Sequence, residues 1–253
     1  MYDFTVPMAI VDFIPVALFL IAAIMLQHDL YNKMSKGCFA LFAAGTIDVF
    51  IAGVLQALWK LLYAMGICDF RALNTFFLPA QSLGLLLSGL AVIFMLTIRQ
   101  KWKDVALIRK EPKGDAEAEP ADQAEKKDET GLEKYYEDPG AGPGGAALAS
   151  LAMAPKAVSG TFVFIGMMIL GLGMMCGGLS IVASKLKRKR AAIFFILSFV
   201  CCMGMGYLSS RDATFAWVNW AEQGINIVAQ LALLIGTIIL HRAGLEKFGA
   251  EEE

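Results

Sequence analysis

The sequence predicts an all-α polytopic membrane protein, and its composition and the spacing of its apolar runs both support this fold class. Of its 253 residues, 57% are hydrophobic and only 18% are charged, whereas soluble domains carry about 25% charged residues. A soluble globular fold is therefore excluded. Because backbone N–H and C=O groups cannot stay unpaired in lipid, each apolar run predicts a helix.

Six runs with few or no charges are long enough to cross a bilayer at about 1.5 Å per helical residue, the fifth only barely. They fall into two groups of three, which predict a first membrane half at 1–98 and a second at 159–241, followed by a polar tail at 242–253. The runs are Val6 to Leu26, Cys38 to Met65, Phe76 to Ile98, Thr161 to Ala183, Ala191 to Leu208 and Ala213 to Leu240.

The segment 99–158 between the two halves is charged and rich in Gly, Pro and Ala. It begins with basic residues, and acidic residues outnumber basic ones from Glu111 to Asp138. Such a composition buries little apolar surface, so we expect a disordered or loosely helical linker.

The number of crossings stays open between six and seven. Six crossings divide the flanking basic residues almost evenly between the two sides. A seventh, through a membrane-inserted segment at 141–158, leaves only Arg71, Lys156 and Arg211 on the outer side, as the positive-inside rule prefers. The apolar part of this segment is short and rich in Gly and Ala, so the seventh crossing of this 3+1+3 plan would be weak or re-entrant.

The third runs of the two groups resemble each other, which suggests an internal repeat. Ala80 to Ile98 aligns without gaps on Ala221 to Ile239. Six crossings would make the two halves inverted, whereas seven would make them parallel, and secondary transporters use both plans. Chance similarity between two apolar helices is the alternative.

The last run carries a stripe of polar side chains through an otherwise apolar helix. At 100° per residue these side chains share one face. Lipid cannot accept such a face, so it must look into protein or into a water-filled cavity. The stripe consists of Asn219, Glu222, Gln223, Asn226, Gln230, Thr237 and His241.

A second polar line follows the second run, where Asp48, Gln56 and Lys60 share one arc. We expect Asp48 to be protonated, solvated or paired with an amide of the last run, and Lys60 to extend to the membrane surface. Together, the two lines give the candidate substrate-binding residues Asp48, Gln56, Glu222, Gln223, Asn226 and Gln230. A polar packing seam between helices is the alternative interpretation.

Catalytic and metal-binding motifs are not found. The two histidines lie at the ends of runs, the five cysteines include no CxxC pair, and the glycines of the fourth run follow no strand. Those glycines instead predict close helix packing. We therefore expect no catalytic residues, no metal and no cofactor, and an enzyme is the least favoured class.

Two function classes remain. The first is a small secondary transporter or permease-like protein for an unidentified small polar solute or cation. The second is a noncatalytic membrane scaffold or accessory subunit, with a second copy or another membrane subunit as partner. In both, the chain resides in a lipid bilayer, a plasma membrane or bacterial inner membrane, and nothing favours nucleic-acid binding.

Overall fold

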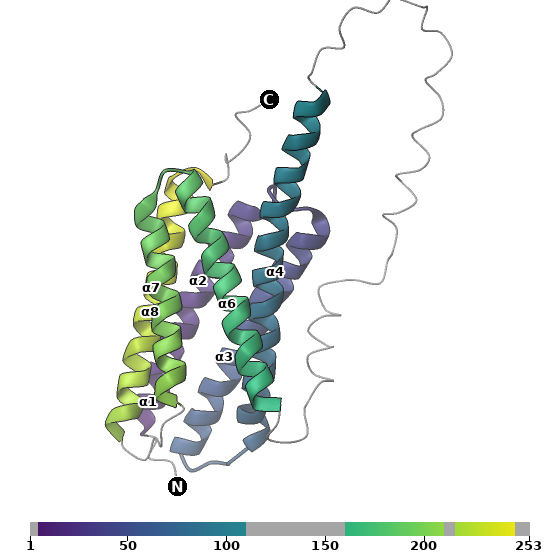
Figure 1. The fold of residues 1–253 in the computed structure, drawn as a ribbon. Helices are drawn as coiled ribbons and strands as arrows, with labels where there is room; N and C mark the ends of the chain where they lie inside the picture. Colours follow the sequence, from purple (N-terminus) through teal and green to yellow (C-terminus); the bar gives the residue numbers. More distant parts are fainter. Residues whose placement is uncertain (1–4, 110–159, 210–215, 246–253) are drawn as a thin grey trace, which may run out of the picture.

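A computed structural model describes residues 5–109, 160–209 and 216–245, and all of its regular structure in these ranges is helical (Figure 1). The long helices lie side by side in one bundle, and α4 continues beyond it at one end. The helices are α1 (Val6–Val11), α2 (Phe13–Leu30), α3 (Lys36–Ala64), α4 (Arg71–Arg109), α6 (Gly160–Lys185), α7 (Lys189–Ser209) and α8 (Ala216–Arg242).

Five spans in the described residues are long and apolar enough to cross a membrane: Val6–Leu30, Lys36–Ala64, Arg71–Thr97, Val163–Lys185 and Trp217–Arg242. The prediction of an all-helical, multi-pass membrane protein is confirmed at this level. Helix α7 has 21 residues and is not among the five spans. It begins with Lys189 and Arg190, so its uncharged part is short, although it packs within the same bundle.

Two predicted boundaries change in the structure. The first run is interrupted at Asp12, which separates α1 from α2. Helix α4 begins at Arg71 and continues to Arg109, beyond both ends of the predicted run from Phe76 to Ile98. The rest of the predicted linker, including the membrane-inserted segment at 141–158, and the end of the tail from 246 onwards lie outside the described residues.

Local signals explain where the helices begin and end. Ser35 precedes α3, and its hydroxyl oxygen accepts a hydrogen bond from the Cys38 backbone N–H at 3.3 Å, as a helix N-cap does. After α3, Gly66 adopts a φ of +69°, a left-handed conformation that glycine reaches without steric cost. The chain reverses direction at both places, so α2 packs against α3 and α3 packs against α4.

The six long helices form a closed ring in the order α2, α3, α4, α6, α7, α8 and back to α2. Contacts fix their directions. The Gln27 amide reaches Thr46 and Val16 faces Gly53, so α2 and α3 are antiparallel. Asp29 reaches His241, and Met8 of α1 reaches Gln223, so the first helices run parallel to α8.

Helices α4 and α6 also run parallel, and glycines allow their backbones to touch. A Cβ on Gly171 would overlap the Leu85 and Leu86 backbone, and a Cβ on Gly178 would overlap Val92 one to two turns further on. Matching positions therefore advance together along both helices. The expected close packing of the glycine-rich fourth run is found at these two positions.

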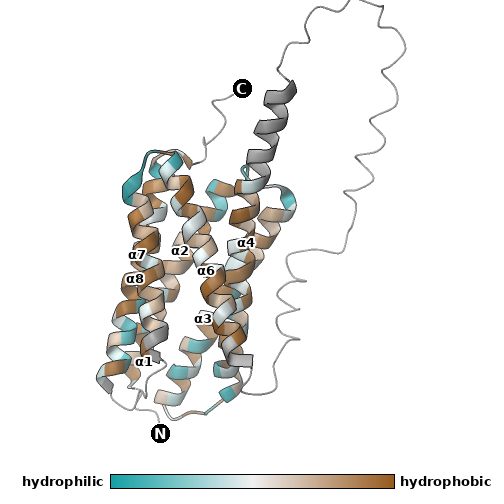
Figure 2. Ribbon diagram, viewed as in Figure 1, coloured by the Kyte–Doolittle hydropathy of each residue, from teal (hydrophilic) through white to brown (hydrophobic). Residues whose placement is uncertain are grey.

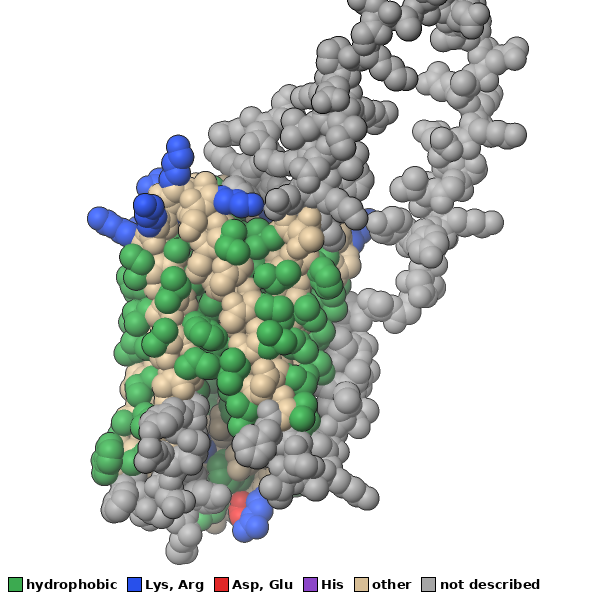
Figure 3. All heavy atoms as spheres, viewed as in Figure 1, with side chains coloured by type: hydrophobic (Ala, Val, Ile, Leu, Met, Phe, Trp, Pro, Cys, Tyr) green, Lys and Arg blue, Asp and Glu red, His purple; other side chains and the backbone are tan. Residues whose placement is uncertain are grey.

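The parallel directions give the bundle two chemically different ends. We call the end where α2 finishes and α7 begins the basic end, and the other end, where α1 lies, the α1 end (Figure 1). Blue Lys and Arg side chains gather at the basic end in Figure 3, and green hydrophobic side chains cover the flank between the ends. Figure 2 shows the matching belt of apolar ribbon. Exposed apolar side chains include Ile21 and Ile24 of α2 and Ile193 and Val200 of α7, as expected for a lipid-facing surface.

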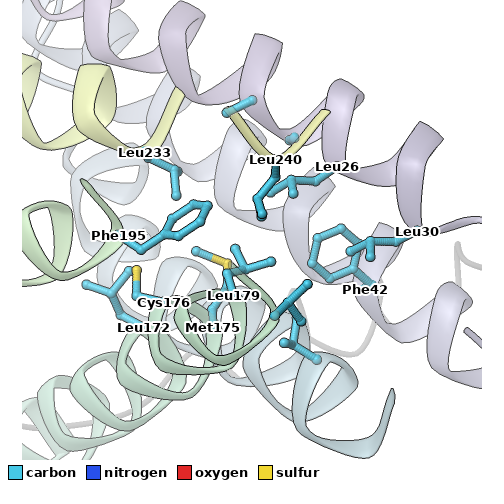
Figure 4. Packing of buried hydrophobic residues seen from close by; sticks show 14 of the residues in the cluster. Leu26, Leu30, Phe42, Leu172, Met175, Cys176, Leu179, Phe195, Leu233 and Leu240 are labelled. Atoms are coloured by element: carbon cyan, nitrogen blue, oxygen red, sulfur yellow. The ribbon is translucent and has the colours of Figure 1, made fainter. Parts of the chain in front are cut away.

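The half of the bundle nearer the basic end has a dense apolar core (Figure 4). Leu26, Leu30, Phe42, Leu179 and Leu240 are at most 2% exposed. They come from four of the six ring helices, α2, α3, α6 and α8, and Phe195 supplies the contact from α7. This half is therefore filled by side chains.

Candidate functional site

The half of the bundle nearer the α1 end contains a cavity of about 180 Å³. All six ring helices contribute to its wall. The lining residues fall between Asp12 and Phe19, Val49 and Lys60, Phe77 and Leu85, Met168 and Met175, Ser198 and Met205, and Asn219 and Leu233. Leu172, Met175 and Leu233 also belong to the apolar core, so they form the floor between the cavity and the filled half.

The structure brings five of the six candidate binding residues to this one cavity. Gln56 of α3 lies across it from Glu222, Gln223, Asn226 and Gln230 of α8. The polar stripe of α8 thus faces the inside of the bundle, as expected for a face that lipid cannot accept. Asn219, from the same stripe, also lines the wall.

Asp48, the sixth candidate, lies apart from the other five. Its side chain is buried in α3, but it does not line the cavity. Around the helix axis it is far from Gly53 and Lys60, which do line the cavity, because successive residues turn by about 100°. Asp48 therefore lies outside the site that the other five residues form.

An ion pair lies in the cavity wall. The Lys60 ammonium is 2.6 Å from Oδ2 of Asp12, and the two side chains are only 19% and 11% exposed. The expectation that Lys60 extends to the membrane surface is therefore wrong. The Asp12 carboxylate pairs with the Lys60 ammonium inside the bundle, so the ammonium does not depend on solvation by water at the membrane surface.

Gln223 connects α8 to the start of the chain. Its Nε2 donates a hydrogen bond of 3.0 Å to the Met8 carbonyl oxygen. A carbonyl only accepts, so this contact also fixes the orientation of the amide, with Oε1 on the other side. Among the described residues, Oε1 of Gln223 and Oε1 of Gln230 are buried and accept no hydrogen bond. An acceptor that is buried without a donor costs free energy. Each of these two oxygens can therefore gain by accepting a hydrogen bond from a bound molecule.

The cavity is apolar on its α6 side. Met168, Leu172 and Met175 are the α6 residues that line it, at the i, i+4, i+7 spacing of one helix face. Phe19, Phe50 and Phe77 add aromatic rings from the first half of the chain. The wall is therefore amphipathic, with charges and amides mainly from the Asp12 segment, α3 and α8.

A second acidic contact closes the bundle near the basic end. Oδ1 and Oδ2 of Asp29 lie 2.9 and 3.1 Å from Nδ1 of His241. The Asp29 side chain has no exposed surface. His28 Nδ1 approaches the same carboxylate at 3.4 Å. The contact joins α2 to α8 on the far side of the apolar core from the cavity.

At the α1 end, the turn between α3 and α4 is tied to α3. The indole N–H of Trp59 donates to Oδ1 of Asp69 at 3.2 Å, and the Arg71 guanidinium donates to Oδ2 at 2.9 Å. The Arg71 hydrogen bond is the main reason that the pKa of Asp69 is lower than its ordinary value.

Sequence reasoning missed three polar members of the wall, Asp12, Gln81 and Ser198. Asp12 was noticeable as a carboxylate within an apolar run, but nothing in the sequence links it to Lys60. Gln81 lies two residues after Pro79 in α4, outside both polar lines. A signal was present for Gln81, because the alignment of Ala80 to Ile98 on Ala221 to Ile239 pairs it with Glu222.

Within the described ranges, no group of three or more His, Cys, Asp or Glu side chains is arranged to hold a metal ion. Comparison of the chain with protein-family models, with curated proteins and with solved structures finds no match. The arrangement of the cavity is therefore the basis for a functional assignment.

Proposed function

We propose that this protein binds a small polar solute inside the membrane and acts as a small secondary transporter or permease-like protein. The observation that carries the proposal is the amphipathic cavity on one side of a filled apolar core. Transport by alternating access requires a central site that reaches one side of the membrane while the other side is closed. A cavity near the α1 end and a core near the basic end have this asymmetry.

The proposal includes an orientation in the membrane. Basic residues on the cytoplasmic side set the orientation of membrane proteins. In the described residues, the basic end holds Lys33, Lys36, the basic part of α4 after Ile98, the turn from Lys185 to Arg190, and Arg242. In the same ranges, the α1 end holds one basic residue, Arg71. Lys60 belongs to the same half of the bundle but lies in the cavity wall. The cavity then faces the outer side, and the filled core lies toward the cytoplasm.

The same orientation supports seven crossings. Arg109 ends α4 at the basic end, whereas Gly160 begins the parallel α6 at the α1 end. The chain between them has to lead from the cytoplasmic side to the outer side. The proposal therefore has two parallel three-helix halves joined by a crossing, a 3+1+3 plan with the amino terminus outside and the carboxyl terminus inside.

The ring order is compatible with two related halves, and the helix directions favour a parallel relation. Exchanging α2 with α6, α3 with α7 and α4 with α8 reproduces the same set of neighbouring pairs. Corresponding faces then line the cavity from both halves. Val49, Gly53 and Gln56 of α3 have the same spacing as a triplet in α7, namely Ser198, Cys202 and Met205. The cavity would thus lie on the axis that relates the two halves.

A scaffold is the second candidate function, and the contact of Gln223 with Met8 is the observation that favours it. Here the amide joins two chain segments, as in a polar packing seam. A packing seam does not explain why the other amides, such as Gln56 and Asn226, line a cavity.

Replacing Gln230 with Leu tests the proposal. Purified wild-type protein is screened by thermal stability against a panel of polyols, amino acids, organic ammonium compounds and carboxylates. We expect at least one class to raise the melting temperature, and Gln230→Leu to abolish that rise while changing the stability of the free protein by no more than about 1 to 2 kcal/mol. Thr237→Val is the matched control, because Thr237 lies on the same stripe but donates to Leu233 of its own helix and does not line the cavity. A panel without any stabilising solute, or equal responses in all three proteins, contradicts the proposal.

A further inference from the structure

We propose that the cavity takes a small amphipathic organic cation whose positively charged group donates hydrogen bonds and whose apolar body packs on α6. This inference deepens the proposed function and rests on it, because it assigns a substrate class to the same cavity. Three independent properties of the wall support it, namely its charge, its hydrogen-bonding capacity and its shape.

The first property is the charge of the wall. Among the described lining residues, Asp12 and Glu222 are acidic and Lys60 is basic, so the wall has an excess of one acidic group. The one basic group, the Lys60 ammonium, is held 2.6 Å from an acidic group of the same wall, Oδ2 of Asp12. A cation entering the cavity is attracted by this excess of negative charge, whereas an anion has to compete with Asp12 for Lys60.

The second property is the supply of hydrogen-bond acceptors. The Nε2 of Gln223 already donates to Met8, so what remains of this amide is an acceptor, Oε1. Oε1 of Gln230, two helical turns further along α8, is also buried without a donor among the described residues. A rotation of the Gln230 amide toward the cavity would let its Oε1 accept from a ligand N–H, while the Gln223 amide keeps its bond to Met8. An ammonium or amidinium group supplies such donors, and charged donors form the stronger hydrogen bonds.

The third property is the apolar side of the cavity. Met168, Leu172 and Met175 of α6 present flexible apolar side chains to the cavity, and Phe77 adds an aromatic ring. Methionine adapts to irregular apolar ligands, and aromatic faces attract cations. The volume of about 180 Å³ is slightly larger than the roughly 150 Å³ of an engineered apolar cavity that holds benzene. A solute with one ring, or a chain of similar size, and one ammonium group fits these limits.

Three probes of nearly equal size separate the possibilities. Benzylammonium carries the proposed cation, benzyl alcohol is its neutral counterpart, and benzoate reverses the charge. Binding to the full chain in detergent is measured by isothermal titration calorimetry at neutral pH. We expect benzylammonium to bind at least about tenfold more tightly than benzyl alcohol, and benzoate not to bind, since a charge pair in a partly enclosed site is worth about this factor.

Variants of the acidic residues identify the group that recognises the cation. Glu222→Gln keeps the size of the side chain and should weaken benzylammonium about tenfold while leaving benzyl alcohol unchanged. Asp69→Asn is the control, because Asp69 is acidic but does not line the cavity. The comparison of the three probes on the wild-type protein needs no variant, so it holds even if Glu222→Gln fails to fold.

The outcomes distinguish the inference from the proposed function. Equal binding of benzylammonium and benzyl alcohol overturns the cation inference but leaves a solute site. Preferential binding of benzoate also overturns it and makes Lys60 the recognising group. If none of the three binds, the inference is wrong. If, in addition, a water-soluble thiol reagent does not reach a cysteine at position 226, the proposed function fails as well.

Discussion

Lys60 and Asp12 form an ion pair inside the bundle, with Nζ of Lys60 2.6 Å from Oδ2 of Asp12. The two residues come from different helical segments, and both line the cavity. The pair therefore fixes the junction of α1 and α2 against α3 while placing two charges beside the binding space. Each charge makes the other tolerable at membrane depth.

We expect the loss of one partner to be more harmful than the loss of both. Lys60→Met leaves the Asp12 carboxylate partly buried without its ammonium and should lower the free energy of unfolding by about 1 to 3 kcal/mol. Lys60→Met combined with Asp12→Asn should recover part of that loss. Thermal denaturation of the two single variants and the double variant in detergent gives the coupling free energy. Strict additivity of the two single effects would show that the pair contributes nothing.

The contact between Asp29 and His241 should stabilise the half of the bundle nearer the basic end. His241→Ala removes the imidazole from a carboxylate that has no exposed surface, so we expect a loss of about 2 kcal/mol or more. Arg242→Ala, at the exposed neighbouring position, is the control and should change stability by less than about 0.5 kcal/mol. Chemical denaturation measures both. A similar small effect of the two substitutions would mean that the Asp29 contact is not needed for packing.

Glycine at the crossing of α4 and α6 should be required for the parallel packing. Gly171→Ala places a Cβ on the Leu85 and Leu86 backbone, which cannot yield as a flexible side chain does, so we expect destabilisation by about 1 to 3 kcal/mol. Gly177→Ala is the matched control, because a Cβ there meets no atom within 4 Å. Alanine at that position should be neutral or stabilising, since it favours helix more than glycine does. Finding Gly171→Ala as stable as Gly177→Ala would argue against the contact.

The seven-crossing proposal predicts the sidedness of four positions. Reporters fused after Lys36 and after Arg190 should both be cytoplasmic, and cysteines at Ile67 and at Val163 should both react with an impermeant reagent from outside. These positions lie at the basic end and the α1 end of the bundle, respectively. An inverted arrangement places position 190 opposite position 36, and that result would rule out parallel halves.

The sequence was sufficient to predict the membrane class, the helical fold and the inward-facing stripe of α8. These features depend on hydropathy and on the 100° turn per residue, which act within one segment. The pairing of Asp12 with Lys60 and the position of Asp48 away from the cavity depend on how α1, α2 and α3 rotate against one another. Shape complementarity between helices determines those rotations, and a single sequence contains no direct measure of it. The parallel α4 and α6 were one of two plans that the charge distribution left open, and the backbone contact at Gly171 supplies the direction.

Water access to the cavity tests the central claim most directly. In a variant whose five native cysteines are replaced, single cysteines are introduced at Asn226 in the cavity wall, at Thr237 in the filled half, and at Val228, whose side chain is 47% exposed on the lipid-facing flank. A charged, membrane-impermeant thiol reagent is added to the outside of sealed vesicles. The account predicts fast modification at position 226 and little at 237 or 228, because water reaches the cavity but neither the core nor the lipid. Modification at 226 as slow as at 237 would contradict a solute site and leave the polar stripe as a packing seam.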